Sequence, residues 1–209
     1  MKKWIWLISC CALTFGTQAL AATSRPQQAA PQAAQSEDKT APSYDMKAQA
    51  ALDMQQMQQK FVSLAQAIPQ EKYNWRPSQD VRSVAELFLH TAAASFNFPP
   101  LMETPVAAGF DGKGFEKSTT EKAKIVDWLN KSFAYSINSV QSMSNADFAK
   151  LLPKLRPQAN EGDIIYLLVV HDHEMLDQAI SYTRSIGVVP PWTAAAQKKK
   201  DNNPQTDKD

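Results

Sequence analysis

Cysteine is almost missing from this 209-residue sequence, and its two cysteines, Cys10 and Cys11, both stand near the start. They fall inside an expected secretory signal peptide at 1–22, where a positively charged start precedes a short apolar run and Ala19-Leu20-Ala21 offers small residues for cleavage. A lipoprotein signal ending at Cys10 is an alternative, although the apolar run before it is short. After cleavage no thiol and no disulfide would remain, so stability must come from the hydrophobic core. We expect a periplasmic or secreted protein.

An excess of one charge is also missing. Removal of Lys2 and Lys3 with the signal leaves 20 basic residues against 21 acidic ones, a net charge of about −1. No basic patch stands out, so nucleic-acid binding driven by charge is not expected. No later segment is apolar for long enough to span a bilayer, and we expect no stable membrane span after signal cleavage.

Strand-like alternation, internal repeats and a glycine-rich phosphate loop are missing as well. Four segments instead carry apolar residues at alternating steps of three and four, which is typical of amphipathic helices. These segments are Ser43–Ile68, Ser83–Asn97, Ser118–Met143 and Gly162–Gly187. The pattern predicts an all-α fold, a four-helix bundle at 43–193. We expect a disordered N-terminal leader at 23–42, rich in Ala, Gln, Pro and Ser, and a disordered C-terminal tail at 194–209.

Local signals mark the ends of these helices. Ser83 with Glu86, and Ser118 with Glu121, match the capping-box pattern at the starts of the second and third helices. Gly187 is the expected stop of the fourth helix. One stripe of that fourth helix is predicted to face the core, and it consists of Ile164, Leu168, His171, Met175, Gln178 and Tyr182.

Histidine occurs three times, and only on two of the predicted helices. His90 lies in the second helix, and His171 and His173 lie in the fourth. Two inward imidazoles from different helices could share one metal ion, with room left for water. His173 should point away from His171, because two residues correspond to about 200° around a helix. The alternative is that His90 and His171 are hydrogen-bonded core residues and that Met175 is ordinary packing.

Four segments together resemble the DinB-like superfamily of small helical bundles. They are Ile68–Arg82 with its Arg76-Pro77, Val81–Leu87 leading to His90, the helix around Ser132–Tyr135, and the stretch from His171 and Glu174 through Tyr182 and Arg184 to Gly187–Pro191. The resemblance covers roughly Ala48–Trp192. It implies a four-helix bundle that holds one divalent transition metal through three histidines from two helices.

In this resemblance His90 is the metal ligand from the second helix, and His171 is the first ligand of the fourth. The third ligand is normally a histidine, where this sequence has Met175, and Asp177 replaces the usual small residue two places later. Zinc or nickel is the metal that the resemblance implies. Copper is possible as well, because a thioether binds zinc or nickel poorly and copper(I) fairly well. His173 could substitute only in a locally distorted helix.

The resemblance therefore implies a secreted, metal-dependent enzyme of the hydrolase or transferase type, in which a metal-activated water or thiol is the nucleophile. Its small-molecule substrate is unknown. The alternative is a non-catalytic binding or scaffold protein with the same fold and a degenerate metal site. A weak site formed by His90, His171 and a water or carboxylate lies between these two. A homodimer is possible if an apolar face is exposed.

Overall fold

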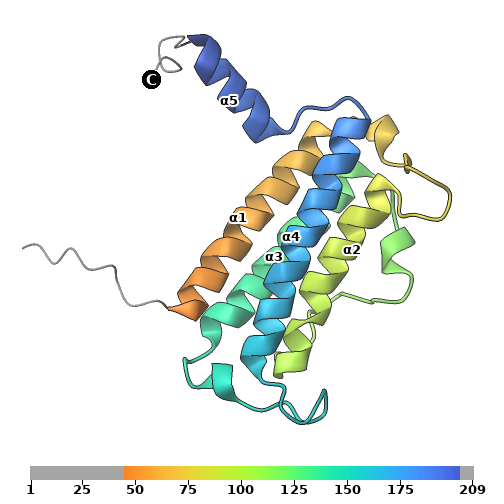
Figure 1. The fold of residues 1–209 in the computed structure, drawn as a ribbon. Coiled ribbons are helices and arrows are strands. Elements are labelled where there is room, and N and C mark those ends of the chain that lie inside the picture. Colours follow the sequence, from red (N-terminus) through yellow and green to blue (C-terminus); the bar gives the residue numbers. More distant parts are fainter. Residues whose placement is uncertain (1–44, 203–209) are drawn as a thin grey trace, which may run out of the picture. The chain divides into compact units, whose positions relative to one another are not determined.

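The computed structural model describes residues 45–202 of the chain (Figure 1). The expected signal peptide at 1–22, the leader at 23–42 and residues 203–209 lie outside this range. Within it the only β-type pairing is an isolated antiparallel bridge between Leu151 and Asn160. The α-helices are α1 (Met46–Ala67), α2 (Val84–Asn97), α3 (Lys122–Ser142), α4 (Glu161–Ser185) and α5 (Pro191–Asn202). The all-α prediction is confirmed. No helix of the described chain has both the length and the apolar character needed to cross a membrane.

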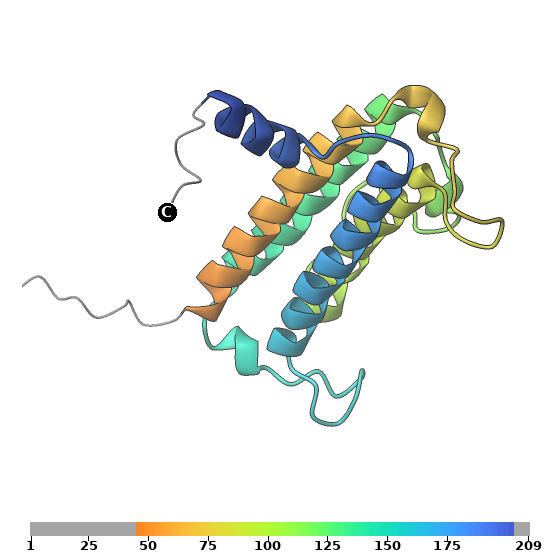
Figure 2. The ribbon, with the colours of Figure 1, turned by 45° about the horizontal axis from the view of Figure 1, so that its top comes forward.

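Helices α1 to α4 form a bundle in which neighbours along the chain are not always neighbours in space. Helices α1 and α2 each pack against both α3 and α4, which places α1 diagonally opposite α2 (Figures 1 and 2). Helices α2 and α3 run in the same direction. A parallel pair needs a long crossover, and residues 98–121 provide it along the outside of the bundle.

Aromatic side chains hold this crossover against the bundle. It contains two short 3-10 helices, η2 (Pro99–Met102) and η3 (Phe115–Lys117). Phe115 is buried, with its ring 5.1 Å from that of Trp128 on α3 and 6.4 Å from that of Phe96 on α2. Phe110 stacks on Phe96 at 4.5 Å. These contacts fix the position of the crossover over α2 and α3.

The core-facing stripe of α4 differs from the predicted one. Ile164, Leu168 and Tyr182 are buried as predicted, but His171, Met175 and Gln178 are only half-buried. The centre of the buried face also includes Ile165, Asp172, Leu176, Ala179 and Thr183. The stripe is rotated by about one residue relative to the predicted one, which did not include Asp172. The predicted stripe of α1 is confirmed by buried Met54, Met57, Phe61 and Leu64.

One of the two predicted capping boxes exists. The Ser83 hydroxyl accepts from the Glu86 backbone N–H, and the Glu86 carboxylate accepts from the Ser83 N–H. The box predicted at Ser118 was wrong. Ser118 is the C-terminal residue of the η3 turn, and α3 begins only at Lys122, after Glu121, whose side chain makes no cap. The short helix η3 follows the left-handed Gly114, and the backbone N–H of Ser118 donates to the Phe115 carbonyl to close it.

The tail also differs from the prediction. Helix α5 continues to Asn202 through a segment expected to be disordered from residue 194. Its start at Pro191 fits the preference of proline for the first helical position, and the alanines that follow favour a helix. No residue of α5 is buried.

Replacement of the two serines tests the capping difference. We expect Ser83→Ala to lower the free energy of unfolding by about 1 kcal/mol, because it removes an N-cap hydrogen bond at the start of α2. Ser118→Ala should change it by less than about 0.5 kcal/mol. Urea denaturation followed by circular dichroism measures both. Equal losses in the two variants would contradict this assignment.

Candidate metal centre

His90 lies on the one polar edge of an otherwise buried helix. From Val84 to Phe96, every residue of α2 is buried except Glu86 and His90, which are half-buried. Residues four apart share a helix face, so these two side chains point the same way. They face α4, which packs against α2 in the bundle.

His171 meets His90 across the boundary between α4 and α2. The Nε2 atoms of the two rings are 3.2 Å apart, and the ring planes are inclined at 57°. The His90 side chain is 24% exposed and that of His171 is 18% exposed, so the pair is reached from solvent without lying open to it. Two histidines that are 81 positions apart in the sequence thus present the same ring nitrogen to one point.

Glu116, from the end of the crossover, fixes the orientation of His90. The Oε1 atom of Glu116 is 2.7 Å from Nδ1 of His90, and its Oε2 atom accepts a 2.8 Å hydrogen bond from Nε of Arg82. Partial burial would raise the pKa of Glu116, but the hydrogen bonds from Arg82 and His90 outweigh it and lower the pKa. Glu116 is therefore an acceptor, and His90 must carry a proton on Nδ1.

This proton placement constrains His171. A neutral His90 with its proton on Nδ1 has a bare lone pair on Nε2. A hydrogen bond between the two rings then requires that His171 donate from Nε2, which leaves its Nδ1 bare. That Nδ1 is buried without a hydrogen-bond partner, 3.9 Å from a carboxylate oxygen of Asp172. Two lone-pair acceptors would face each other there, which is unfavourable in a buried site.

A protonated Asp172 that donates to Nδ1 would avoid this conflict, and so would two states of His171. One is a cationic ring with protons on both nitrogens. The other is a neutral ring with its proton on Nδ1 and its Nε2 lone pair directed, like that of His90, at a metal ion. Two nitrogens bound tetrahedrally to one zinc ion lie about 3.3 Å apart, given Zn–N bonds of about 2.0–2.1 Å. The observed 3.2 Å fits this arrangement.

The third ligand position is where the site departs from a three-histidine set. Met175 lies one turn after His171 on α4, half-buried and packed against the core. His173 points away, as predicted, and its Nε2 is 2.8 Å from Oδ2 of Asp53 on α1. Among residues 45–202, no group of three His, Cys, Asp or Glu side chains is placed to hold an ion. The imidazole pair fits a metal, and a further protein ligand would have to be the Met175 thioether.

Asp172 is the most unusual residue near the pair. Its side chain is fully buried, and neither carboxylate oxygen has a hydrogen-bond partner. Burial raises its pKa from 3.8 to about 6. Helix α4 holds one other buried carboxylate, Glu161, which is 3% exposed and lies 3.4 Å from Nζ of Lys150. Asp172 therefore has no Lys or Arg partner of the kind that Glu161 has in Lys150.

Glu116 and Asp172 were not predicted as site residues. Glu116 is one of many charged residues of a connecting segment, and only the packing of neighbouring Phe115 brings it to His90. Asp172 stands beside a candidate ligand, but an aspartate in a helix is usually exposed. Its position between Leu168 and Leu176, one turn away on either side, was the available signal.

The fold and the site define an all-α four-helix bundle with a histidine pair contributed by α2 and α4. A sequence model of the DinB superfamily matches residues 53–179 of the chain, a span that includes His90, His171 and Met175. The chain belongs to the DinB superfamily, and the predicted resemblance is confirmed. No curated protein matches the chain in a sequence comparison. Metal binding by the three residues remains a prediction.

The two carboxylates that contact Lys150 should respond to pH in opposite ways. Burial raises the pKa of Glu161, whereas the hydrogen bond from Lys150 lowers that of exposed Glu103. A raised pKa means that stability is lost as pH rises, so wild type should lose stability relative to Glu161→Gln between about pH 4 and pH 7. Relative to Glu103→Gln, wild type should gain stability at lower pH, between about pH 3 and pH 5, because a lowered pKa stabilises the fold above it. Urea denaturation at the two ends of each interval tests this, and the same trend in both variants would contradict it.

Proposed function

We propose that this DinB-superfamily protein is a metal-dependent enzyme of the hydrolase or transferase type. In this proposal His90 and His171 bind one divalent transition metal through their Nε2 atoms. The observation that carries the proposal is the 3.2 Å separation of these two atoms, contributed by two helices. The carboxylate of Glu116 behind His90 supports it, because histidine ligands commonly donate their other N–H to a carboxylate.

Zinc or nickel bound here would supply Lewis acidity that activates a water or a thiol for attack on a substrate. The protein groups have simpler tasks. Glu116 keeps the proton of His90 on Nδ1, so that Nε2 stays free, and Arg82 holds Glu116 in place. The partial exposure of both imidazoles leaves one side open to a small molecule.

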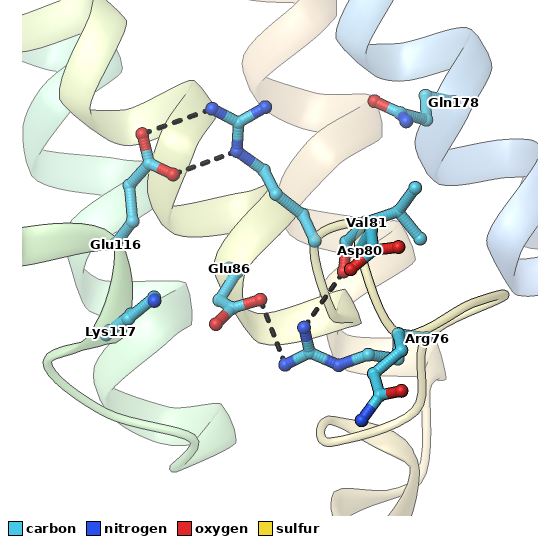
Figure 3. A pocket seen from close by; sticks show the side chains of 9 residues that line it. Arg76, Asp80, Val81, Glu86, Glu116, Lys117 and Gln178 are labelled. Atoms are coloured by element: carbon cyan, nitrogen blue, oxygen red, sulfur yellow. Dashed lines mark hydrogen bonds and ion pairs between the residues drawn. The ribbon is translucent and has the colours of Figure 1, made fainter.

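A polar cavity of about 520 Å³ lies next to the pair and is the proposed substrate site. Figure 3 shows its lining, in which ion pairs join Arg76 to Glu86 and Arg82 to Glu116. Glu116 belongs to both the cavity and the histidine pair. Glu86 lies one turn before His90 on α2, and Gln178 lies two turns after His171 on α4. Glu116 therefore connects the cavity to the imidazole of His90.

The second candidate is a non-catalytic binding or scaffold protein that kept the bundle and lost the metal. Met175 favours it, because the thioether is a poor ligand for zinc or nickel. The missing third His, Cys, Asp or Glu among the described residues favours it too. In that case the His90–His171 contact would be a hydrogen bond between the two rings. Export of the mature protein, with a periplasmic or secreted location, is part of the proposal for either candidate.

Metal binding by purified protein without a histidine tag tests the main proposal. We expect one Zn²⁺ per chain by elemental analysis and by calorimetric titration. His90→Ala and His171→Ala should each weaken Zn²⁺ binding by more than about 100-fold, because changes behind the ligands alone cost about 10–100-fold. His173→Ala is the matched control and should bind as wild type, because His173 contacts Asp53 instead.

The second candidate makes the opposite prediction. No Zn²⁺, Ni²⁺ or Cu⁺ uptake, together with a melting temperature that these ions leave unchanged, would contradict the metal proposal. His171→Leu would then keep or raise the stability of the bundle, because it removes a buried polar nitrogen without a partner.

Replacement of Met175 identifies the preferred metal. Met175→His restores the three-histidine set and should tighten Zn²⁺ binding by at least about tenfold, because imidazole is the better zinc ligand. Met175→Leu keeps the volume and removes the sulfur. If the thioether is a ligand, this variant should lose Cu⁺ affinity and keep Zn²⁺ affinity. Competition titrations measure both, and a Met175→His protein no tighter than wild type would place residue 175 outside the site.

A further inference from the structure

Asp172 occupies a position where the fold calls for an apolar side chain. It lies in the middle of α4, on the buried face, and Leu168 and Leu176 are buried one turn before and after it. A carboxylate in such a place normally has an ion-pair partner or several hydrogen-bond donors. Neither oxygen of Asp172 has a hydrogen-bond partner, and no Lys or Arg of residues 45–202 forms an ion pair with it.

The usual structural reasons for a buried aspartate do not apply. Asp172 is ten or more residues from both ends of α4, so it caps neither end. The neighbouring ion pair of α4 with α1 uses His173 and Asp53 and leaves Asp172 out. The nearest cationic or donor atom recorded for Asp172 is Nδ1 of His171, at 3.9 Å, which is too long for a hydrogen bond.

These two orphaned groups complement each other. Nδ1 of His171 is buried without a partner, and so is the carboxylate beside it. A proton on Nδ1 would convert the pair into a donor and an acceptor, and a shift of about 1 Å would close the contact to hydrogen-bond length. The same proton leaves Nε2 of His171 with a free lone pair directed at His90.

We propose that Asp172 is a positioning residue of the metal site, which accepts the Nδ1–H of His171 and holds its Nε2 toward the ion. The inference rests on the proposed metal function. It gives each imidazole a carboxylate behind it, Glu116 for His90 and Asp172 for His171. The two carboxylates differ in one respect: Arg82 forms an ion pair with Glu116, whereas the only side chain recorded in an ion pair with Asp172 is His171 itself, at 3.9 Å.

Asp172→Asn and Asp172→Ala separate this role from a structural one. Asn removes the charge at nearly constant size, and Ala also removes the acceptor. Both should weaken Zn²⁺ binding by about 10–100-fold, with Ala at the larger end. Metal-free Asp172→Asn should melt at a higher temperature than metal-free wild type, because the unpaired buried carboxylate is gone. A residue with a merely structural role would not combine weaker metal binding with a more stable metal-free fold.

Glu161→Gln is the matched control, because Glu161 is the other buried carboxylate of α4 and does not contact the histidines. It should bind Zn²⁺ as wild type does. Nitrogen-15 imidazole spectra of the Zn²⁺-loaded protein supply an independent measurement. They should show the His171 proton on Nδ1 in wild type, with a signal that shifts in Asp172→Asn and not in Glu161→Gln.

The outcomes are distinguishable. Wild type that binds Zn²⁺, together with an Asp172→Asn variant that binds it equally well and leaves the His171 signal unchanged, would overturn the role of Asp172 alone. Wild type that takes up no Zn²⁺ would overturn both the metal function and this inference. Melting curves of every variant confirm that weaker binding comes from a folded protein.

Discussion

The convergence of two imidazoles between α2 and α4 is the contact on which the proposed chemistry depends. It requires that these helices be neighbours, although α3 separates them in the sequence. The neighbour relation in turn requires the long crossover of residues 98–121, because α2 and α3 run in the same direction. That crossover also delivers Glu116 to the back of His90. One topological feature thus places both a ligand pair and the group that orients it.

The apolar core around the site supplies stability that offsets the free-energy cost of burying the polar groups of the site. Fully buried aromatic and aliphatic side chains from α1, α2 and α3 fill the bundle, including Phe61, Phe88 and Phe133. The Asp172 carboxylate and Nδ1 of His171 are buried there without hydrogen-bond partners. Buried polar groups without partners lower the stability of the fold unless a ligand binds to them. Functional sites commonly retain such groups because ligand binding needs them. The paired Glu161 shows how the same helix accommodates a buried carboxylate that needs no ligand.

Much of the fold followed from periodicity, and the errors came from places where two local patterns compete. The apolar stripe of α1 and the capping box at Ser83 were predicted correctly because each depends on residues within two turns of a helix. The prediction at Ser118 failed because this residue ends the 3-10 helix that holds the buried Phe115 and does not begin α3. The α4 stripe was displaced because Asp172 is buried, although an aspartate in a helix is usually exposed.

The sequence by itself determined that the fold is helical and where the helices approximately begin and end. It also placed the three histidines on two helices and directed His173 outward, since all of these follow from helical spacing. It could not determine that Nε2 of His90 and Nε2 of His171 share one point, that Glu116 backs the first ring, or that Asp172 is buried beside the second. Those relations join residues that are distant in the chain or depend on the rotation of a helix by a single residue. Only the packing of α2, α4 and the crossover against one another decides them.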